Sequence, residues 1–204
     1  NCKNSIFHQG DSAEILKQLN QKFDCIYIDP SRRNNAKVKV FLLEDCMPNV
    51  VEMQNFYYQY STTLLIKTAP MLDLQAAMLG LKHVSEIHIV AVDNEVKEVI
   101  WKTEKNSTQS PTIIAVNIEK NTTQTTRIDW KYPYQSHFSL PKKYLYEPNA
   151  ALMKSGKFDA ISELFGVEKP AISKHLSNLF ESNEIEGSRK VKRNVEFYNL
   201  DVWV

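Results

Sequence analysis

Residues 23–33 read FDCIYIDPSRR, an apolar run that stops abruptly at an acid, a proline and two arginines. This pattern is typical of a buried parallel strand that delivers a carboxylate and a rigid turn to the carboxyl edge of an α/β sheet. Open α/β sheets bind their ligands at that edge. Asp29 is therefore the starting point for the functional predictions below.

The composition is that of an ordinary globular protein with one large or two small domains. The chain has 204 residues, of which 43% are hydrophobic and 24% charged, and its net charge is +1. No apolar run approaches the roughly 18 residues needed to span a bilayer, and no signal segment is recognisable at the start. We therefore expect a cytoplasmic protein. The near-neutral charge argues against nucleic-acid binding through bulk charge, although local basic patches remain possible.

Cysteine and histidine are scattered. Cys2, Cys25 and Cys46 are odd in number and lack metal-ligand spacing, which indicates reduced thiols and no disulfide framework. The five histidines are equally dispersed along the chain. The sequence predicts no metal site.

Working outward from residues 23–33, strand-like and helix-like segments alternate. Residues 5–8 are predicted as a short strand, and Asp11 is predicted to cap a helix of sequence SAEILKQL. Further strands are predicted within 62–70, 86–92 and 112–118, and helices after Pro48 and within 71–81, where Leu72, Ala76 and Leu79 share a face. The segment VKEVIWK is compatible with either state. The alternation predicts a mostly parallel sheet with helices on both faces.

The sequence changes character after the polar stretches NSTQS and NTTQTT, which are predicted to be poor in strand. We therefore place one domain at residues 1–135 and a small α+β module at 136–204. In the module, one helix is predicted with Phe158, Ile161, Leu164 and Phe165 on a single face. A second helix is predicted to begin at Pro170, which is tolerated in a first helical turn. A basic, hairpin-like segment opens at Gly187.

The Asp29-Pro30 dipeptide has two interpretations. Many adenosylmethionine-dependent methyltransferases hold the acceptor group at such a strand end, where a carboxylate and a stiffened carbonyl accept N–H bonds from a base. An aspartate before a proline is also common turn chemistry, in which the side chain merely caps the next turn. The dipeptide alone does not separate them.

Several longer motifs bear on this choice. DCIYIDPSRR, KVFLLEDCMPNV, LLIKTAPMLD and EIHIVAVDNEVKEVIW together resemble a bacterial group of class I methyltransferases that carry a THUMP-like domain. YLYEPNAALMKSGKFDAISELFGVEK resembles the start of that domain, so that roughly four fifths of the chain is covered. The resemblance implies a partial Rossmann-like α/β fold, S-adenosyl-L-methionine as cofactor and RNA as substrate.

The same resemblance assigns roles to individual residues. It places Asp29, Pro30, Ser31 and Arg32 in the catalytic loop, and Asp11 beside the adenine of the cofactor. Arg33 and Lys67 are candidate substrate-binding residues. Arg32, Arg33, Lys37 and Lys39 could contact RNA phosphates or form a solvated loop. By strand register, Lys67 and Asp73 are expected at the same sheet edge as Asp29, where they could line the substrate side or simply mark the end of a strand. Where amino-methyltransferases place an aromatic residue to stack on the base, this chain has Ser31 and Arg32, so methylation of an exocyclic adenine amine is not favoured.

One expected feature is absent from the sequence. Class I methyltransferases hold adenosylmethionine with a glycine-rich turn, whereas the five glycines here are dispersed: Gly10, Gly80, Gly156, Gly166 and Gly187. If Gly10 follows the third strand of the usual order 3-2-1-4-5-7-6, the first two strands lie upstream, and the strand at Asp24 becomes an apolar edge. We therefore expect the C-terminal portion of a methyltransferase, inactive by itself.

The tail supports a rival hypothesis. FGVEKPAISKHLSNLFES and VEFYNLD resemble the winged helix-turn-helix of RhuM-type proteins. In that case Lys174 and His175 would face DNA bases, and the basic segment would bind phosphates through Arg189, Lys190, Lys192 and Arg193. Three further alternatives are a small packing unit without DNA contact, a divergent form of the methyltransferase family's own C-terminal domain, and a join between two genes or two sequence fragments near residue 168.

Overall fold

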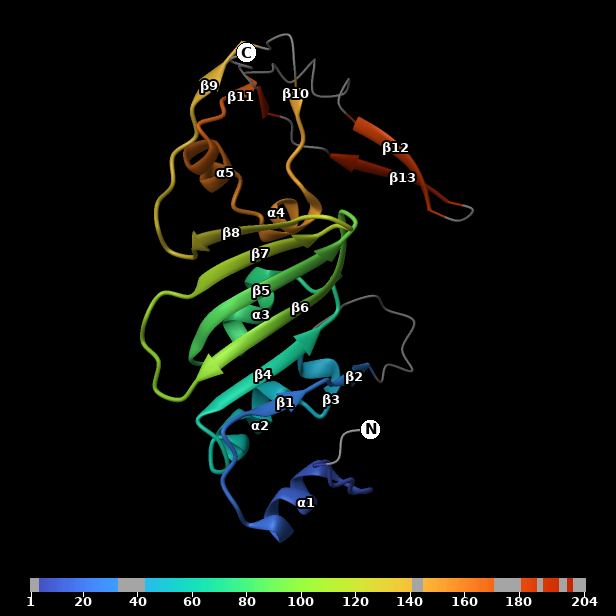
Figure 1. The fold of residues 1–204 in the computed structure, drawn as a ribbon, viewed down its shortest axis with the longest axis vertical. Helices are drawn as coiled ribbons and strands as arrows, with labels where there is room; N and C mark the ends of the chain where they lie inside the picture. Colours follow the sequence, from blue (N-terminus) through green and yellow to red (C-terminus); the bar gives the residue numbers. More distant parts are fainter. Residues whose placement is uncertain are drawn as a thin grey trace. The chain divides into compact units, whose positions relative to one another are not determined.

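The computed structural model describes residues 4–32, 43–140, 145–170, 181–186, 189–194 and 198–199. The chain forms two compact units (Figure 1). Unit 1 comprises Asn1–Ile87 and Val99–Gln109, and unit 2 comprises His88–Glu98 and Ser110–Val204. The domain boundary near residue 135 stays a prediction.

Two parallel strands of unit 1 carry Asp29 and Lys67 at their carboxyl ends. β1 (Ile26–Ile28) pairs with β4 (Thr63–Thr68) so that Ile28 lies opposite Ile66. In β4 every second residue is buried, beginning with Leu64, which is the alternation expected of a strand with one face on the core. The sheet continues in the order β1-β4-β6-β5-β7-β8.

A hairpin follows, in place of another crossover helix. β5 (Val84–Val92) and β6 (Glu95–Glu104) are joined by Asp93 and Asn94, whose φ angles of 48° and 61° are those of a two-residue hairpin turn. The ambiguous VKEVIWK is therefore a strand. β6 runs antiparallel to β4, so β1-β4-β6-β5 corresponds to the last four places of the order 3-2-1-4-5-7-6. The expectation of a mostly parallel sheet is wrong, because hairpins make the later strands antiparallel.

Three capped helices belong to unit 1: α1 (Ser12–Leu19), α2 (Val50–Tyr57) and α3 (Leu74–Gly80). As predicted, Asp11 caps α1, and its Oδ1 accepts the N–H groups of Ala13 and Glu14 at 2.9 and 3.1 Å. Residues 5–8 do not form the predicted strand. The described part of the chain offers them no neighbouring strand with which to pair.

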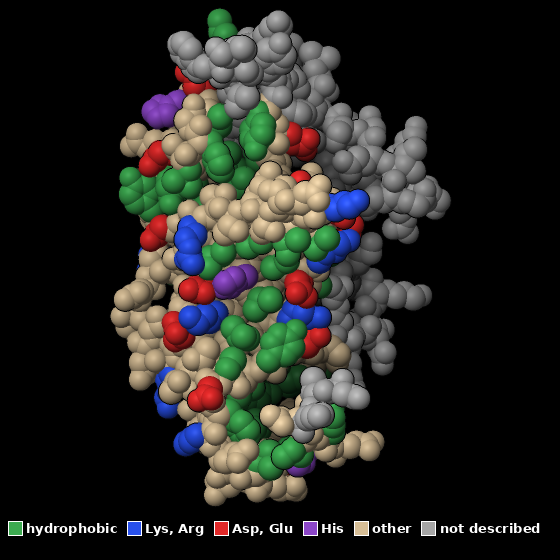
Figure 2. Space-filling view, in the orientation of Figure 1, with side chains coloured by type: hydrophobic (Ala, Val, Ile, Leu, Met, Phe, Trp, Pro, Cys, Tyr) green, Lys and Arg blue, Asp and Glu red, His purple; other side chains and the backbone are tan. Residues whose placement is uncertain are grey.

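The helices α2 and α3 lie side by side, because a Cβ added at Gly80 would meet Val51 at 3.1 Å. Figure 1 shows both behind the strands of unit 1. The opposite face is open to view, and Figure 2 shows hydrophobic side chains there among charged ones. Helices on both faces are thus not found among the described residues of unit 1. The predicted face of α3 is also wrong, since Leu74 and Ala77 are buried and Leu79 is 91% exposed.

Unit 2 is built on a second hairpin. β7 (Thr112–Ile118) pairs antiparallel with β8 (Thr123–Asp129), and α4 (Ala150–Ser155) packs on β7. NTTQTT therefore enters a strand, contrary to prediction. Threonine favours strands through its β-branched side chain, and residues 123–125 are exposed, so polarity costs nothing there.

The rest of unit 2 differs in part from the predicted helical module. In α5 (Phe158–Phe165) the buried residues are Ala160, Ile161 and Ser162, whereas Leu164 and Phe165 are about half exposed. Pro170 lies in β11 (Lys169–Pro170), which pairs with β9 (Phe138–Ser139), and not in a first helical turn. The helix expected after it falls on residues 171–180, outside the described residues.

Two further strand pairs complete the described tail. β10 (Leu145–Tyr146) pairs with β14 (Tyr198–Asn199), and β12 (Glu181–Glu186) pairs antiparallel with β13 (Arg189–Asn194). The basic segment predicted to open at Gly187 contains the second strand of this hairpin, and its partner strand β12 carries Glu181, Glu184 and Glu186. Across the described residues, no helix combines the length and apolar character that crossing a bilayer requires.

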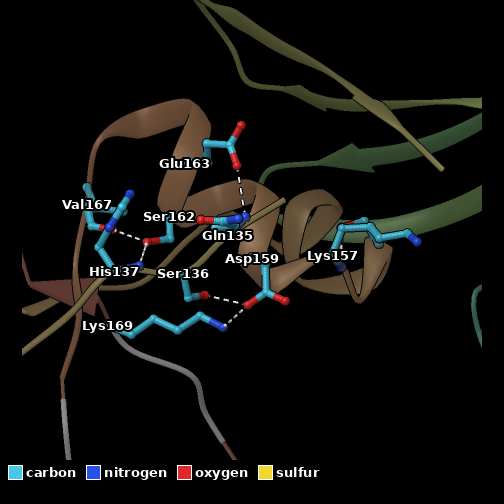
Figure 3. Close-up of polar contacts among 10 residues, drawn as sticks. Gln135, Ser136, His137, Lys157, Asp159, Ser162, Glu163, Val167 and Lys169 are labelled. Atoms are coloured by element: carbon cyan, nitrogen blue, oxygen red, sulfur yellow. Dashed lines mark hydrogen bonds and ion pairs between the residues drawn. The ribbon is translucent and has the colours of Figure 1, made fainter. Parts of the chain in front are cut away.

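Polar side chains of α5 form hydrogen bonds with the extended segments around this helix (Figure 3). Ser162 Oγ accepts the N–H of His137 at 3.1 Å, and Glu163 accepts the N–H of Gln135 at 2.8 Å. The carboxylate of Asp159 accepts bonds from Ser136 Oγ and, at 3.1 Å, from Lys169 Nζ. The hydrogen bond from Ser136 and then that from Lys169 lower the pKa of Asp159.

Asp159→Asn should therefore destabilise unit 2 at pH 7 and have little effect in acid. A lowered folded-state pKa contributes stability above the unfolded-state pKa and loses it as the pH falls through the folded value. The side chain is 59% exposed, so we expect about 1 kcal/mol or less at pH 7. Urea unfolding at pH 7 and pH 3 measures this difference. The control is Glu147→Gln, and an equal loss at both pH values contradicts the assignment.

Candidate active site

The parallel pairing of β1 with β4 brings two predicted site residues together. Asp29 and Lys67 follow the paired residues Ile28 and Ile66. Lys67 Nζ lies 2.7 Å from Asp29 Oδ2, and the two side chains are 30% and 52% exposed. Asp29 is thus at the carboxyl edge of the sheet and accessible, as the sequence predicts, although its role there stays a prediction.

The alternation of side chains in β1 decides which way Asp29 points. Ile28 is buried against the core and Tyr27 is 56% exposed. Because successive side chains of a strand point to opposite faces, Asp29 shares the face of Tyr27. Lys67 likewise shares its face with Leu65, which lies opposite Tyr27. The ion pair therefore belongs to the face of the sheet away from the buried residues of β4.

A short ladder fixes the turn that follows. β2 (Ser31–Arg32) pairs antiparallel with β3 (Cys46–Met47), and Ser31 Oγ donates to the Met47 carbonyl oxygen at 3.3 Å. A 3-10 turn, η1 (Leu43–Asp45), leads into β3. The Asp29-Pro30 bend is consequently held at both ends, by β1 on one side and by β2 on the other. Such anchoring restricts the positions that the Pro30 carbonyl can take.

A buried polar pair supports the end of β4, and sequence reasoning did not anticipate it. Trp101 is completely buried, and its Nε1 donates to Thr68 Oγ1 at 2.9 Å. Thr68 Oγ1 also donates to the Val99 carbonyl oxygen at 3.3 Å. Thr68 directly follows Lys67, so this pair fixes the strand end that carries the lysine. The only signal in the sequence is a threonine at a core position of β4 and a tryptophan in a strand whose assignment was ambiguous.

Cys25 directly precedes β1, at the opposite end of this strand from Asp29, and desolvation raises the pKa of its thiol. The backbone hydrogen bond involving Leu65 and the charge of Lys102 act in the opposite direction. A raised pKa makes the thiol a weaker nucleophile at neutral pH.

Other predicted site residues lie elsewhere or have structural partners. Asp11 is the exposed cap of α1, and both of its backbone bonds end on Oδ1. Asp73 caps α3 by accepting the N–H of Ala76 at 2.9 Å. Only the backbone of Arg32 is described, where it pairs with Cys46. Arg33, Lys37 and Lys39 lie outside the described residues.

The described residues contain no cluster of three or more His, Cys, Asp or Glu side chains suited to a metal ion. A cavity of about 410 Å³ lies in unit 2 between the β5–β6 and β7–β8 turns, lined by Asp93, Asn94, Glu119, Lys120, Asn121 and Thr122. None of the predicted site residues lines it. Its position provides no link to Asp29.

The residues of the rival DNA-binding hypothesis are only partly described. Lys174 and His175 lie outside the described residues. Arg189, Lys190, Lys192 and Arg193 all fall in β13, where the backbone pairs with β12 and Arg189 lies opposite Glu186. A basic strand in a hairpin is what a wing requires. Its contact with DNA stays a prediction.

Two comparisons with known proteins bear on these observations. A crystal structure from Porphyromonas gingivalis W83, of a protein provisionally described as a methyltransferase, matches with a TM-score of 0.64 and 29% identity. The match covers 77% of this chain and 39% of that one. A ferredoxin-like domain family matches residues 144–187. No curated protein matches.

The comparisons confirm the α/β fold class, a partial Rossmann-like methyltransferase sheet with a small C-terminal module. They support methyltransferase chemistry at a coarse level, since the similar structure is described in those terms. The chain spans only 39% of the length of that protein. For residues 144–187 the similarity is to a ferredoxin-like domain, and the THUMP-like assignment remains a resemblance.

The site predicts a contrast between two neighbouring substitutions. Thr68→Val should cost about 1 to 3 kcal/mol of unfolding free energy, because it leaves the buried N–H of Trp101 without an acceptor. Lys67→Met should cost less than about 1 kcal/mol, because its ion pair is partly exposed. Urea unfolding followed by tryptophan fluorescence measures both. Equal costs would show that the Thr68–Trp101 pair does not support this strand end.

Proposed function

We propose that this chain carries the acceptor side of a methyltransferase that transfers a methyl group from S-adenosyl-L-methionine to RNA. The observation that supports this most directly is the accessible Asp29 at the end of β1, held by Lys67 at 2.7 Å. The structural similarity to a protein described as a methyltransferase supports the reaction class. RNA rests on the sequence resemblance to THUMP-bearing enzymes.

In this proposal Asp29, Pro30 and Lys67 have positioning roles. Lys67 engages Oδ2 of Asp29, and Oδ1 has no donor among the described residues. Oδ1 and the Pro30 carbonyl oxygen can then accept N–H bonds from a base and orient it. Orientation is the main contribution that a protein makes to methyl transfer, because little covalent help is needed. The ladder at Ser31 and Met47 keeps the bend in place while the base is bound.

Among the described residues, no glycine-rich turn provides a cradle for the cofactor. Gly10 precedes the cap of α1, and Gly80, Gly156 and Gly166 lie at or beyond helix ends, so none forms a glycine-rich turn between a strand and a helix. Asp11 is occupied as a cap through Oδ1. We therefore assign this chain no step that involves the cofactor itself, only the placement of the acceptor.

Substitution of Asp29 tests the proposal. In the product of the full gene, Asp29→Ala should lower transfer of tritiated methyl groups to RNA by about 100-fold or more, because the acceptor loses its orientation. Lys67→Met should give a smaller loss. Asp24→Ala, an exposed acid at the other end of β1, is the matched control. Unchanged transfer by Asp29→Ala with normal folding would overturn the assignment.

Cofactor binding provides an independent test. The 204-residue chain should show no saturable binding of S-adenosyl-L-methionine by calorimetry, since it lacks a glycine-rich turn. The full gene product, titrated in the same way, is the comparison. Tight stoichiometric binding by the 204-residue chain would contradict the view that it carries only the acceptor side.

A second candidate function is a DNA-binding regulator module, and the basic β13 hairpin favours it. Replacement of Lys174 and Arg193 by alanine should then weaken retention of duplex DNA and leave methyl transfer unchanged. If the methyltransferase proposal holds, the same double variant should bind duplex DNA no differently from the parent chain.

A further inference from the structure

Residues 129–134, which we call the aromatic turn, are unusually well fixed for an exposed loop. Asp129 Oδ1 accepts Ser110 Oγ at 2.7 Å and the N–H groups of Lys131 and Tyr132 at 2.7 and 3.0 Å. The N–H of Asp129 donates to the hydroxyl of Tyr134 at 3.0 Å. The hydrogen bond from Ser110, and after it the one from the Lys131 N–H, lower the pKa of Asp129. The ionised carboxylate therefore accepts hydrogen bonds from within the turn.

Contacts between Lys157 and Trp130 stabilise the start of the aromatic turn. Lys157 Nζ lies 4.4 Å from the centroid of the Trp130 ring and donates to the Trp130 carbonyl oxygen at 2.7 Å. The N–H of Trp130 donates to Pro111 at 2.9 Å. The backbone from 129 to 132 is therefore bonded at nearly every residue. The fold has already restricted the conformations of this segment.

The two tyrosines of the turn differ in their contacts: Tyr134 forms a side-chain hydrogen bond, whereas Tyr132 is largely exposed. The two rings meet edge to face with their centroids 4.5 Å apart. Tyr134 contributes its hydroxyl to the turn, whereas the hydroxyl of Tyr132 has no partner among the described residues and 53% of Tyr132 is exposed. An aromatic ring held still and exposed can stack with little further loss of entropy.

Two cations lie near Tyr132 along the chain. Arg127 precedes the aromatic turn in β8 and Lys131 lies within it, and both are exposed. Within the described residues neither forms an ion pair, while Asp129 is satisfied by three donors. An exposed aromatic ring on a segment that also carries cations without an ion pair among the described residues matches a nucleobase and its neighbouring phosphates. An acidic peptide would use the cations and leave the ring unexplained.

We infer that the aromatic turn is a contact site for single-stranded RNA, with one base stacked on Tyr132 and phosphates beside Arg127 and Lys131. This rests on the proposed function for the choice of RNA and adds the surface on which unit 2 holds it. The contact is sequence-tolerant, because every base offers a π face.

The test is fluorescence anisotropy of a labelled 12-nucleotide single-stranded RNA with the 204-residue chain. Tyr132→Ala should weaken binding by about 5- to 150-fold, and Tyr132→Phe should retain it within about 2-fold, because stacking needs the ring and not the hydroxyl. Phe138→Ala removes an aromatic residue that is 64% exposed elsewhere in unit 2 and should change binding by less than about 2-fold. Equal effects of Tyr132→Ala and Phe138→Ala would overturn the inference.

Salt dependence tests the cationic part. Lys131→Ala should reduce the slope of log K against log salt by about 0.7, the value for one phosphate contact on a single strand. Lys120→Ala, an exposed lysine at the β7–β8 turn, should leave the slope unchanged. Displacement of the RNA by polyglutamate of equal charge would mean that charge alone is recognised, which also overturns the inference.

This binding experiment is separable from the proposed function. Loss of RNA binding in Tyr132→Ala with no methyl transfer by the full gene product would refute the methyltransferase proposal and retain the contact site. Methyl transfer to RNA by the full gene product, with unchanged RNA binding by Tyr132→Ala, would support the methyltransferase proposal and refute the contact site. Melting temperatures of all variants, measured by circular dichroism, should match the parent because Tyr132 is mostly outside the core.

Discussion

The parallel pairing of β1 with β4 is the constraint on which the rest of unit 1 depends. Its register, with Ile28 opposite Ile66, buries one face of both strands and leaves Asp29 and Lys67 as neighbours at the carboxyl edge. A slip by one residue would turn the acid toward the core and an isoleucine toward solvent. Core packing therefore positions the charged pair, although the pair itself adds little stability.

Support for this edge comes from β6, which arrives by a hairpin. Antiparallel pairing places Trp101 opposite Ile66 and Val99 opposite Thr68, so the buried indole N–H finds an acceptor at the end of β4. A buried donor without a partner is costly. The folded state therefore requires Thr68 to lie within hydrogen-bonding distance of Trp101. The Thr68–Trp101 hydrogen bond and the pairing of β4 with β6 together fix the strand end that carries Lys67.

Unit 2 combines a buried apolar core with polar side-chain contacts at its surface. Beyond the β7–β8 hairpin, its segments are short. Asp159, Ser162 and Glu163 of α5 form hydrogen bonds with these segments. Such bonds are individually weak at an exposed surface. The aromatic turn follows the same plan, with Asp129 satisfying several backbone groups. These local polar contacts add to an apolar core that includes Ile113, Ile128, Leu152 and Ile161.

The sequence by itself determined the strand that ends at Asp29, the cap of α1 by Asp11 and the helix after Pro48, because each rests on local pattern. It did not decide whether VKEVIWK is a strand, that NTTQTT enters β8, or which face of α3 is buried. Those depend on partners distant in the sequence. Only the tertiary structure placed Lys67 against Asp29 and Trp101 against Thr68, since strand order and register are properties of the assembled sheet and not of any one segment.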